Sequence, residues 1–147
     1  MTIEEAVKIA NKKYFVEKTK VLGYDDDALN FEYSVYSNKN KKETLFSFNE
    51  GYDNKSKNKV FRIVIKNPKY ITQEGIRVDM SLKELKEKTQ LKSADYNNND
   101  GLYIFSEKFD GGYWMFIDQK KYRTYNFDKP KINKLPEDLT VKGIILF

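Results

Sequence analysis

The chain contains no cysteine and no histidine. Without these residues it cannot form disulfides, the common structural zinc sites, a Ser-His-Asp triad or a Cys-His nucleophile pair. The absence of cysteine fits both oxidising and reducing surroundings, so it does not identify the compartment. Most familiar enzyme mechanisms are excluded, and we expect a binding protein that is not an enzyme and uses no cofactor or metal.

Long hydrophobic runs are also missing. No apolar stretch approaches the about 18 residues that a membrane-spanning helix needs, so we expect no membrane span. The first residues, 1–5, lead directly into a helical pattern and lack the basic, apolar and small-residue segments of a secretion signal. We therefore expect a cytoplasmic protein or, if a signal was removed, a periplasmic or other extracytoplasmic one.

Charge of one sign is not concentrated anywhere. The 147 residues include 27 Lys and Arg against 22 Asp and Glu, a net charge of +5. The basic residues are divided almost evenly, with 14 in residues 1–70 and 13 in residues 71–147, so neither half is a basic arm. Nucleic acid is therefore not the partner we expect. Hydrophobic residues make up 39% of the chain, which is enough for a folded core in a single domain over 1–147.

The first half of the chain shows one helical pattern followed by strand patterns. Thr2 and Glu5 have the spacing of a capping box, and apolar residues then recur at helical spacing from Ile3 to Tyr14. Alternation of apolar and polar residues predicts half-buried strands further on. The predicted strands are residues 31–36, 44–48 and 59–66.

The second half repeats this order. Ser81 and Glu84 form another capping-box pair before a short helix that we expect to end near Gln90. The strands predicted after it are residues 102–109, 113–117, 122–127 and 141–147. The predicted fold class is α+β, with two helices packed on one face of a mainly antiparallel sheet.

The two halves can be read as a tandem duplication. Thr2 and Ser81 lie 79 residues apart, which suggests two α-β-β-β units over residues 1–70 and 71–147. The alternative is that any α+β domain with hairpins produces such an echo. The sequence leaves both explanations open.

Aromatic residues are abundant, with 10 Phe, 11 Tyr and one Trp. Alternation in 113–117 places Trp114 and Phe116 on the sheet face opposite Met115. The helices must cover one face of the sheet, and a one-sided core needs large apolar side chains on that face alone. Aromatic residues on the second face therefore indicate a binding surface. The candidate binding residues are Trp114, Phe116, Tyr113, Tyr103 and Tyr33.

The segment 63–85 resembles a strand, loop and helix of uncharacterised Bacteroidetes proteins. The motif is Gly-Ile-x-Val-Gly-x-Ser-Leu-x-Glu-Leu, and this chain matches it over 75–85 except that Asp79 replaces the second Gly. The repeated α-β-β-β pattern also resembles the β-lactamase-inhibitor-protein architecture and the small lipoprotein of the outer-membrane assembly machinery. These resemblances imply helices on one face of an antiparallel sheet, whose other face grips a protein. They imply no catalytic residues.

Other clusters suggest different chemistry. The acidic turns 25–27 and 95–101 carry oxygen ligands, but the second has Asp100 at the position where a calcium loop needs Gly. The segment 120–134 interleaves basic and aromatic residues, as a groove for single-stranded nucleic acid does. Paired carboxylates across a cleft would instead indicate a hydrolase.

The function we expect is protein binding by occlusion through the aromatic sheet face. Such a protein would be an inhibitor, an immunity-type antitoxin or an envelope-assembly factor. The alternatives are a carboxylate-based hydrolase, a single-stranded nucleic-acid binder that uses segment 120–134, and a ligand-binding module of the envelope. The partner's identity and the oligomeric state are left open.

Overall fold

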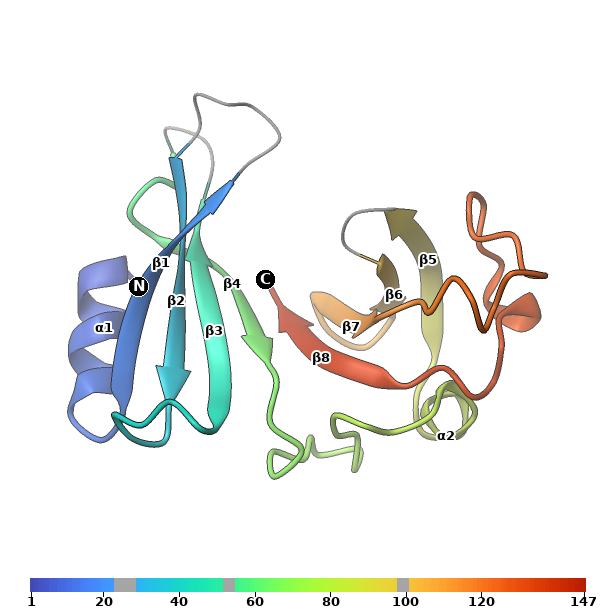
Figure 1. Ribbon diagram of the computed structural model, residues 1–147, viewed down its shortest axis with the longest axis horizontal. Helices are drawn as coiled ribbons and strands as arrows, with labels where there is room; N and C mark the ends of the chain where they lie inside the picture. The colour runs from blue at the N-terminus through green and yellow to red at the C-terminus, as the bar shows by residue number, and fades with distance from the viewer. Residues whose placement is uncertain (23–28, 52–54, 98–100) are drawn as a thin grey trace. The chain divides into compact units, whose positions relative to one another are not determined.

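The computed structural model describes residues 1–22, 29–51, 55–97 and 101–147 (Figure 1). The chain divides into two compact units, the first formed by Met1–Asn67 with Phe147 and the second by Pro68–Leu146. In the described residues, each unit contains one α-helix followed by four strands. Neighbouring strands within each unit are antiparallel.

The first unit is a helix beside a sheet whose strands follow chain order. Its elements are α1 (Ile3–Asn11), β1 (Phe15–Leu22), β2 (Leu29–Tyr36), β3 (Thr44–Glu50) and β4 (Val60–Ile65). Each of these strands pairs with the next in the chain, from β1 to β4. Such hairpin connections need only local turns, because consecutive antiparallel strands lie side by side.

The predicted capping box starts α1. The Thr2 hydroxyl accepts a hydrogen bond from the Glu5 N–H at 3.2 Å, and the Glu5 carboxylate accepts one from the Thr2 N–H at 2.9 Å. Hydrogen bonds from the backbone N–H and the side chain of Thr2 to the Glu5 carboxylate hold the pKa of this carboxyl below its usual value. Ile3, Ala6 and Ala10 then form the buried side of the helix. The helix ends three residues before the predicted end at Tyr14.

The core of the first unit includes Tyr33, Val35 and Phe48 together with the buried side of α1. The rings of Tyr33 and Phe48 are stacked, with centroids 5.2 Å apart. This packing follows from the register, because Tyr33 of β2 is directly opposite Phe48 of β3. Aromatic pairs of this kind stabilise a core beyond their buried area.

Strand β1 was not predicted, and its sequence explains why. The residue of β1 opposite Tyr33 in the register is Lys18, which interrupts the apolar alternation that marks a strand. The Lys18 ammonium lies 3.8 Å from the centroid of the Phe31 ring. Lys18 thus covers an aromatic ring at the sheet edge. An apolar side chain at this position would have continued the alternation by which a strand is recognised in the sequence.

The second unit has the same order of elements. These are α2 (Leu82–Lys88), β5 (Leu91–Asn97), β6 (Gly101–Ser106), β7 (Gly111–Met115) and β8 (Val141–Leu146), with a short 3-10 helix η1 (Ile132–Lys134) before β8. The spatial order of strands in this unit is β8, β7, β6 and β5. The capping box of Ser81 and Glu84 is present as predicted.

The core of the second unit lies on the sheet face that includes Ile104, Tyr113 and Met115, all of which are fully buried. Leu82 and Leu85 of α2 are buried as well. Burial raises the pKa of the Tyr113 hydroxyl. Ser106 and Thr89, the latter at the end of α2, act in the opposite direction and lower this pKa, but by less than burial raises it.

The second unit differs from the sequence-based expectations in two places. Strand β5 was not predicted, because its sequence LKSADYN has almost no apolar alternation. Residues 122–127 form turns instead of a strand, with Tyr122 and Phe127 buried.

Asp79, at the position where the resembling motif has Gly, has a φ of 70° and so adopts the left-handed conformation that glycine favours.

The α+β fold class with antiparallel strands is confirmed. The single domain and its repeat units 1–70 and 71–147 stay predictions, although both units have the same order of elements. None of the described helices is long and apolar enough to cross a membrane.

Candidate functional site: an aromatic row on the second unit

Three aromatic side chains lie together on one sheet face of the second unit. Tyr103 of β6 is directly opposite Trp114 of β7, and Phe105 is two residues along β6. All three are half-buried, whereas the alternating residues Ile104 and Met115 belong to the core. We call Tyr103, Phe105 and Trp114 the aromatic row. It lies on the face opposite the core, as period-two alternation requires.

Glycines make room for this row. Phe105 is directly opposite Gly112, and Trp114 is opposite Gly143. A Cβ on Gly112 would lie 2.4 Å from the carbonyl oxygen of Ile104, so no larger residue fits there without a backbone shift. An aromatic ring opposite a glycine can spread over the exposed backbone, which favours a flat aromatic surface.

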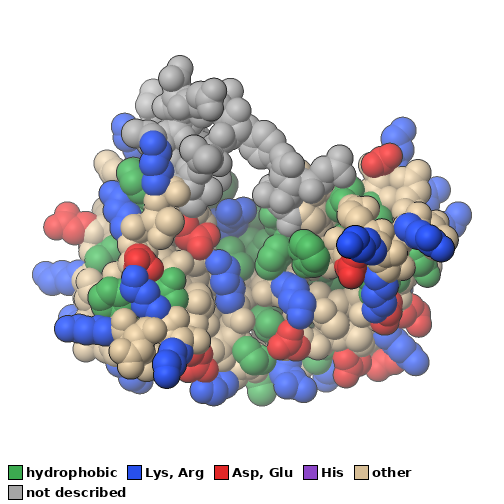
Figure 2. All heavy atoms as spheres, in the orientation of Figure 1, with side chains coloured by type: hydrophobic (Ala, Val, Ile, Leu, Met, Phe, Trp, Pro, Cys, Tyr) green, Lys and Arg blue, Asp and Glu red, His purple; other side chains and the backbone are tan. Residues whose placement is uncertain are grey.

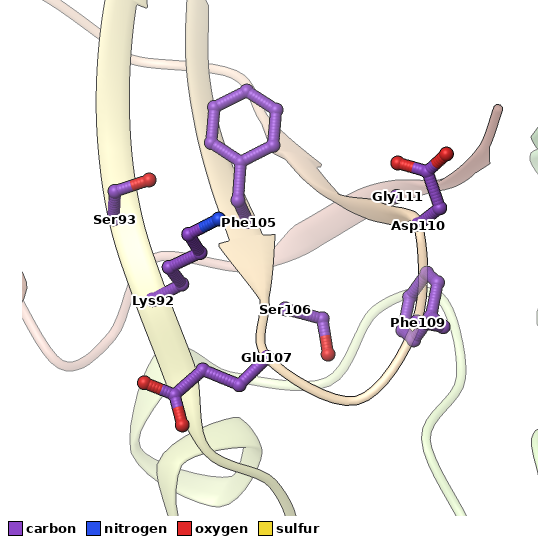
Figure 3. Close-up of a pocket in the computed structure, with 8 residues that line it drawn as sticks. All are labelled: Lys92, Ser93, Phe105, Ser106, Glu107, Phe109, Asp110 and Gly111. Carbon is purple, nitrogen blue, oxygen red and sulfur yellow. The ribbon is translucent and has the colours of Figure 1, made fainter.

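A bulge brings a cation next to the row. The register of β5 against β6 shifts between Leu91 and Ser93, which leaves Lys92 as the extra residue. Bulges re-aim side chains in this way. Figure 3 shows Lys92 and Ser93 projecting from β5 and Phe105 projecting from β6.

These residues line a hollow of about 500 Å³ at the end of the row. Its lining residues are Lys92, Ser93, Phe105, Ser106, Glu107, Phe109, Asp110 and Gly111. The hollow thus offers an ammonium, hydroxyls and an aromatic ring beside the row. Such a mixture suits the edge of a macromolecular interface, where polar groups surround a more apolar centre.

The acidic residues of the hollow do not form a catalytic pair. The carboxylates of Glu107 and Asp110 point away from each other (Figure 3), and both residues are exposed. No Asp or Glu is buried among the residues that the structure describes. The described part of the chain therefore lacks the paired buried acids that would favour the hydrolase alternative.

The predicted binding residues have different positions. Trp114 and Tyr103 belong to the aromatic row, and Phe116, just beyond β7, is 64% exposed. The prediction that Tyr113 and Tyr33 are binding residues is corrected, because their side chains are only 1% and 8% exposed and belong to the two cores. Sequence alternation separates the two faces of a strand, but it does not show which face of β2 is covered by α1.

Phe105 was not among the predicted site residues. Its spacing of two from Tyr103 placed both on the same face, so alternation could have identified it. Lys92 could not have been identified, because a bulge leaves no reliable mark in the sequence.

The basic segment 120–134 does not form a stacking groove. Its aromatic residues Tyr122 and Phe127 are buried, while Tyr125 is exposed. The Lys121 ammonium lies 2.6 Å from the Asp138 carboxylate, and this hydrogen bond raises the pKa of Lys121. Figure 2 shows Lys and Arg side chains spread over the visible face with Asp and Glu among them. These features do not favour the nucleic-acid alternative.

The acidic turns add no site to the described structure. Residues 25–27 and 98–100 lie outside the described residues. Within the described ranges, no group of three or more Asp and Glu side chains could hold a metal ion.

No family model matches the sequence, and no match among curated proteins or solved structures is significant. The resemblances to Bacteroidetes proteins and to the β-lactamase-inhibitor-protein architecture therefore stay predictions.

Proposed function

We propose that this protein binds another protein through the aromatic row and acts by occlusion, without chemistry of its own. The observation that carries the proposal is the direct pairing of Tyr103 with Trp114 on the face opposite the core. Trp and Tyr are enriched among the residues that dominate protein interfaces, because they bury large rigid areas at low entropic cost.

The surroundings of the row support the same function. Phe116 adds an exposed aromatic ring beyond the end of β7. Lys92 and Ser93 add polar groups beside Phe105, and the exposed acids Glu107 and Asp110 follow on the next connection. An apolar centre with a polar rim is the usual composition of a protein interface.

Three biological roles are consistent with this mechanism: an inhibitor, an immunity-type protein and an envelope-assembly factor. All three require a rigid surface that covers part of a partner. A sheet face supplies such a surface, because its side chains are held by strand pairing and not by flexible loops. The identity of the partner would distinguish the three roles.

The first experiment identifies the partner. A photo-crosslinking amino acid replaces Phe116 in cells of the native host, because this exposed position can accept it without disturbing the core. The same substitution at Tyr125, which is exposed in segment 120–134, is the matched control. We expect one protein to be crosslinked from Phe116 and not from Tyr125. If only nucleic acid is crosslinked, or if both positions give the same products, the proposal is wrong.

The second experiment measures affinity for that partner. Replacement of an interface Trp by Ala typically costs about 2 kcal/mol or more, which is about 30-fold in Kd. We expect Trp114→Ala to weaken binding by at least this factor, and Tyr125→Ala to change it less than twofold. A folded Trp114→Ala protein with unchanged affinity would contradict the proposal.

A further inference from the structure

The first unit contains an apolar cavity of about 280 Å³ between α1 and the strands β3 and β4. Its lining residues are Met1, Ala6, Ile9, Ala10, Tyr14, Phe46, Phe48, Val60 and Ile63. All of the lining side chains are apolar apart from the hydroxyl of Tyr14. The cavity belongs entirely to the first unit, so it is separate from the aromatic row.

The cavity marks the side on which the core of the first unit is open. Several apolar residues pack against this core but stay only partly buried. Four of these residues, Tyr14, Phe46, Val60 and Ile63, are also cavity walls. Ile9, another wall residue, is 60% exposed. Apolar surface left accessible in this way favours binding of an apolar group.

Small helix residues create the space. Ala6 is the fourth residue of α1 after its capping residue Thr2, and Leu85 has the same position in α2 after Ser81. Leu85 is completely buried and fills the core of its own unit. An alanine at this position in α1, followed by Ala10 one turn later, leaves part of the space unfilled.

A cation lies beside the cavity. The Lys13 ammonium is 5.6 Å from the centroid of the Tyr14 ring, and Tyr14 is a wall residue. No ion pair within the described part of the chain involves Lys13. An apolar cavity with a cation at its edge matches a ligand that has an apolar chain and one negative charge.

We propose that the first unit binds a medium-chain monocarboxylic acid, with its alkyl chain in the cavity and its carboxylate near Lys13. The cavity is slightly smaller than the about 300–1,000 Å³ of sites for drug-sized ligands, so a narrow alkyl chain fits it better than a fused ring system. A protein partner would need a wider groove than a space of this size. This site does not depend on the proposed function of the aromatic row.

The test uses decanoate as the probe, with calorimetry for affinity and amide NMR shifts for location. We expect shifts at Ala6, Ala10 and Ile63, and none in the second unit. Each buried methylene contributes about fourfold in affinity, so octanoate should bind about 15-fold more weakly. Absence of binding, or shifts confined to the second unit, would overturn the proposal.

The charge near the cavity is tested by Lys13→Met. Lys8→Met, in the preceding helix α1, is the matched control. We expect Lys13→Met to weaken decanoate binding at least fivefold and leave the binding of decanol unchanged, since decanol has no charge. Lys8→Met should change neither. Equal affinity of the unaltered protein for decanol and decanoate would overturn the assignment of an acid as ligand.

The cavity itself is tested by filling it. Ala6→Leu supplies the side chain that Leu85 has in α2, and we expect it to abolish decanoate binding while the melting temperature is kept or raised. Ala10→Val fills less of the cavity and serves as the second variant if Ala6→Leu does not fold. We expect it to weaken decanoate binding at least tenfold. Undiminished binding by a folded variant would overturn the proposal.

Discussion

Tyr103 of β6 and Trp114 of β7 are directly paired across neighbouring antiparallel strands, and both are half-buried. The next residue along each strand, Ile104 or Met115, is fully buried. The same two strands therefore supply the core on one face and the aromatic row on the other. This separation means that substitutions on the two faces should have different consequences for stability and for binding.

Trp114→Ala should lower the free energy of unfolding only moderately. A half-buried side chain loses less than the about 3–5 kcal/mol that truncation of a core aromatic costs, so we expect about 1–2 kcal/mol. Tyr113→Ala, on the core face of the same strand, should cost more. Chemical denaturation of both variants checks this difference. A larger loss for Trp114→Ala would show that Trp114 is a core residue.

Tyr113→Phe should make the protein more resistant to alkali. Burial raises the pKa of the Tyr113 hydroxyl above its usual value, which is near 10 in an unfolded chain. The neutral hydroxyl therefore favours the folded state, and this stability is present below pH 10 and lost as the pH rises through the folded-state pKa. Unfolding free energies between pH 8 and 12 should fall less steeply for Tyr113→Phe than for the unaltered protein. Identical slopes would mean that Tyr113 ionises equally in both states.

Asp79→Gly should stabilise the second unit. Asp79 has a φ of 70°, a left-handed conformation that costs a residue with a Cβ about 1 kcal/mol more than glycine. The substitution removes the exposed ion pair with Lys142 at 3.0 Å, but exposed pairs of this kind contribute little. We expect a gain of about 0.5–1 kcal/mol in thermal or chemical denaturation. Asp79→Ala is the control, and it should give no such gain.

Ser47→Ala should be neutral or stabilising. The Ser47 hydroxyl is fully buried and has no hydrogen-bond partner within the described residues. Its removal eliminates an unpaired polar group, so we expect a gain of up to about 1 kcal/mol in unfolding free energy. Ser34, directly opposite on β2, donates to the Glu32 carboxylate at 3.2 Å. Ser34→Ala is thus the matched control and should cost about 1 kcal/mol. Equal losses for both variants would mean that Ser47 has a partner.

Local sequence determined the helix starts and the separation of faces within the strands that were predicted. A capping box needs only residues three apart, so Thr2 with Glu5 and Ser81 with Glu84 identify both helices. Alternation likewise placed Trp114 and Met115 on different faces of the sheet, since successive side chains in any strand point to opposite faces. These features depend on the nearest few residues and on no other part of the chain.

The tertiary structure decided the rest. Edge strands β1 and β5 form because a neighbouring strand pairs with them, although their own sequences carry little apolar alternation. Tyr33 is a core residue because α1 covers its face of the sheet. The cavity beside Ala6 exists because Phe46, Val60 and Ile63 come together there from two strands. Long-range packing determines which surfaces are covered, and no local pattern encodes that outcome.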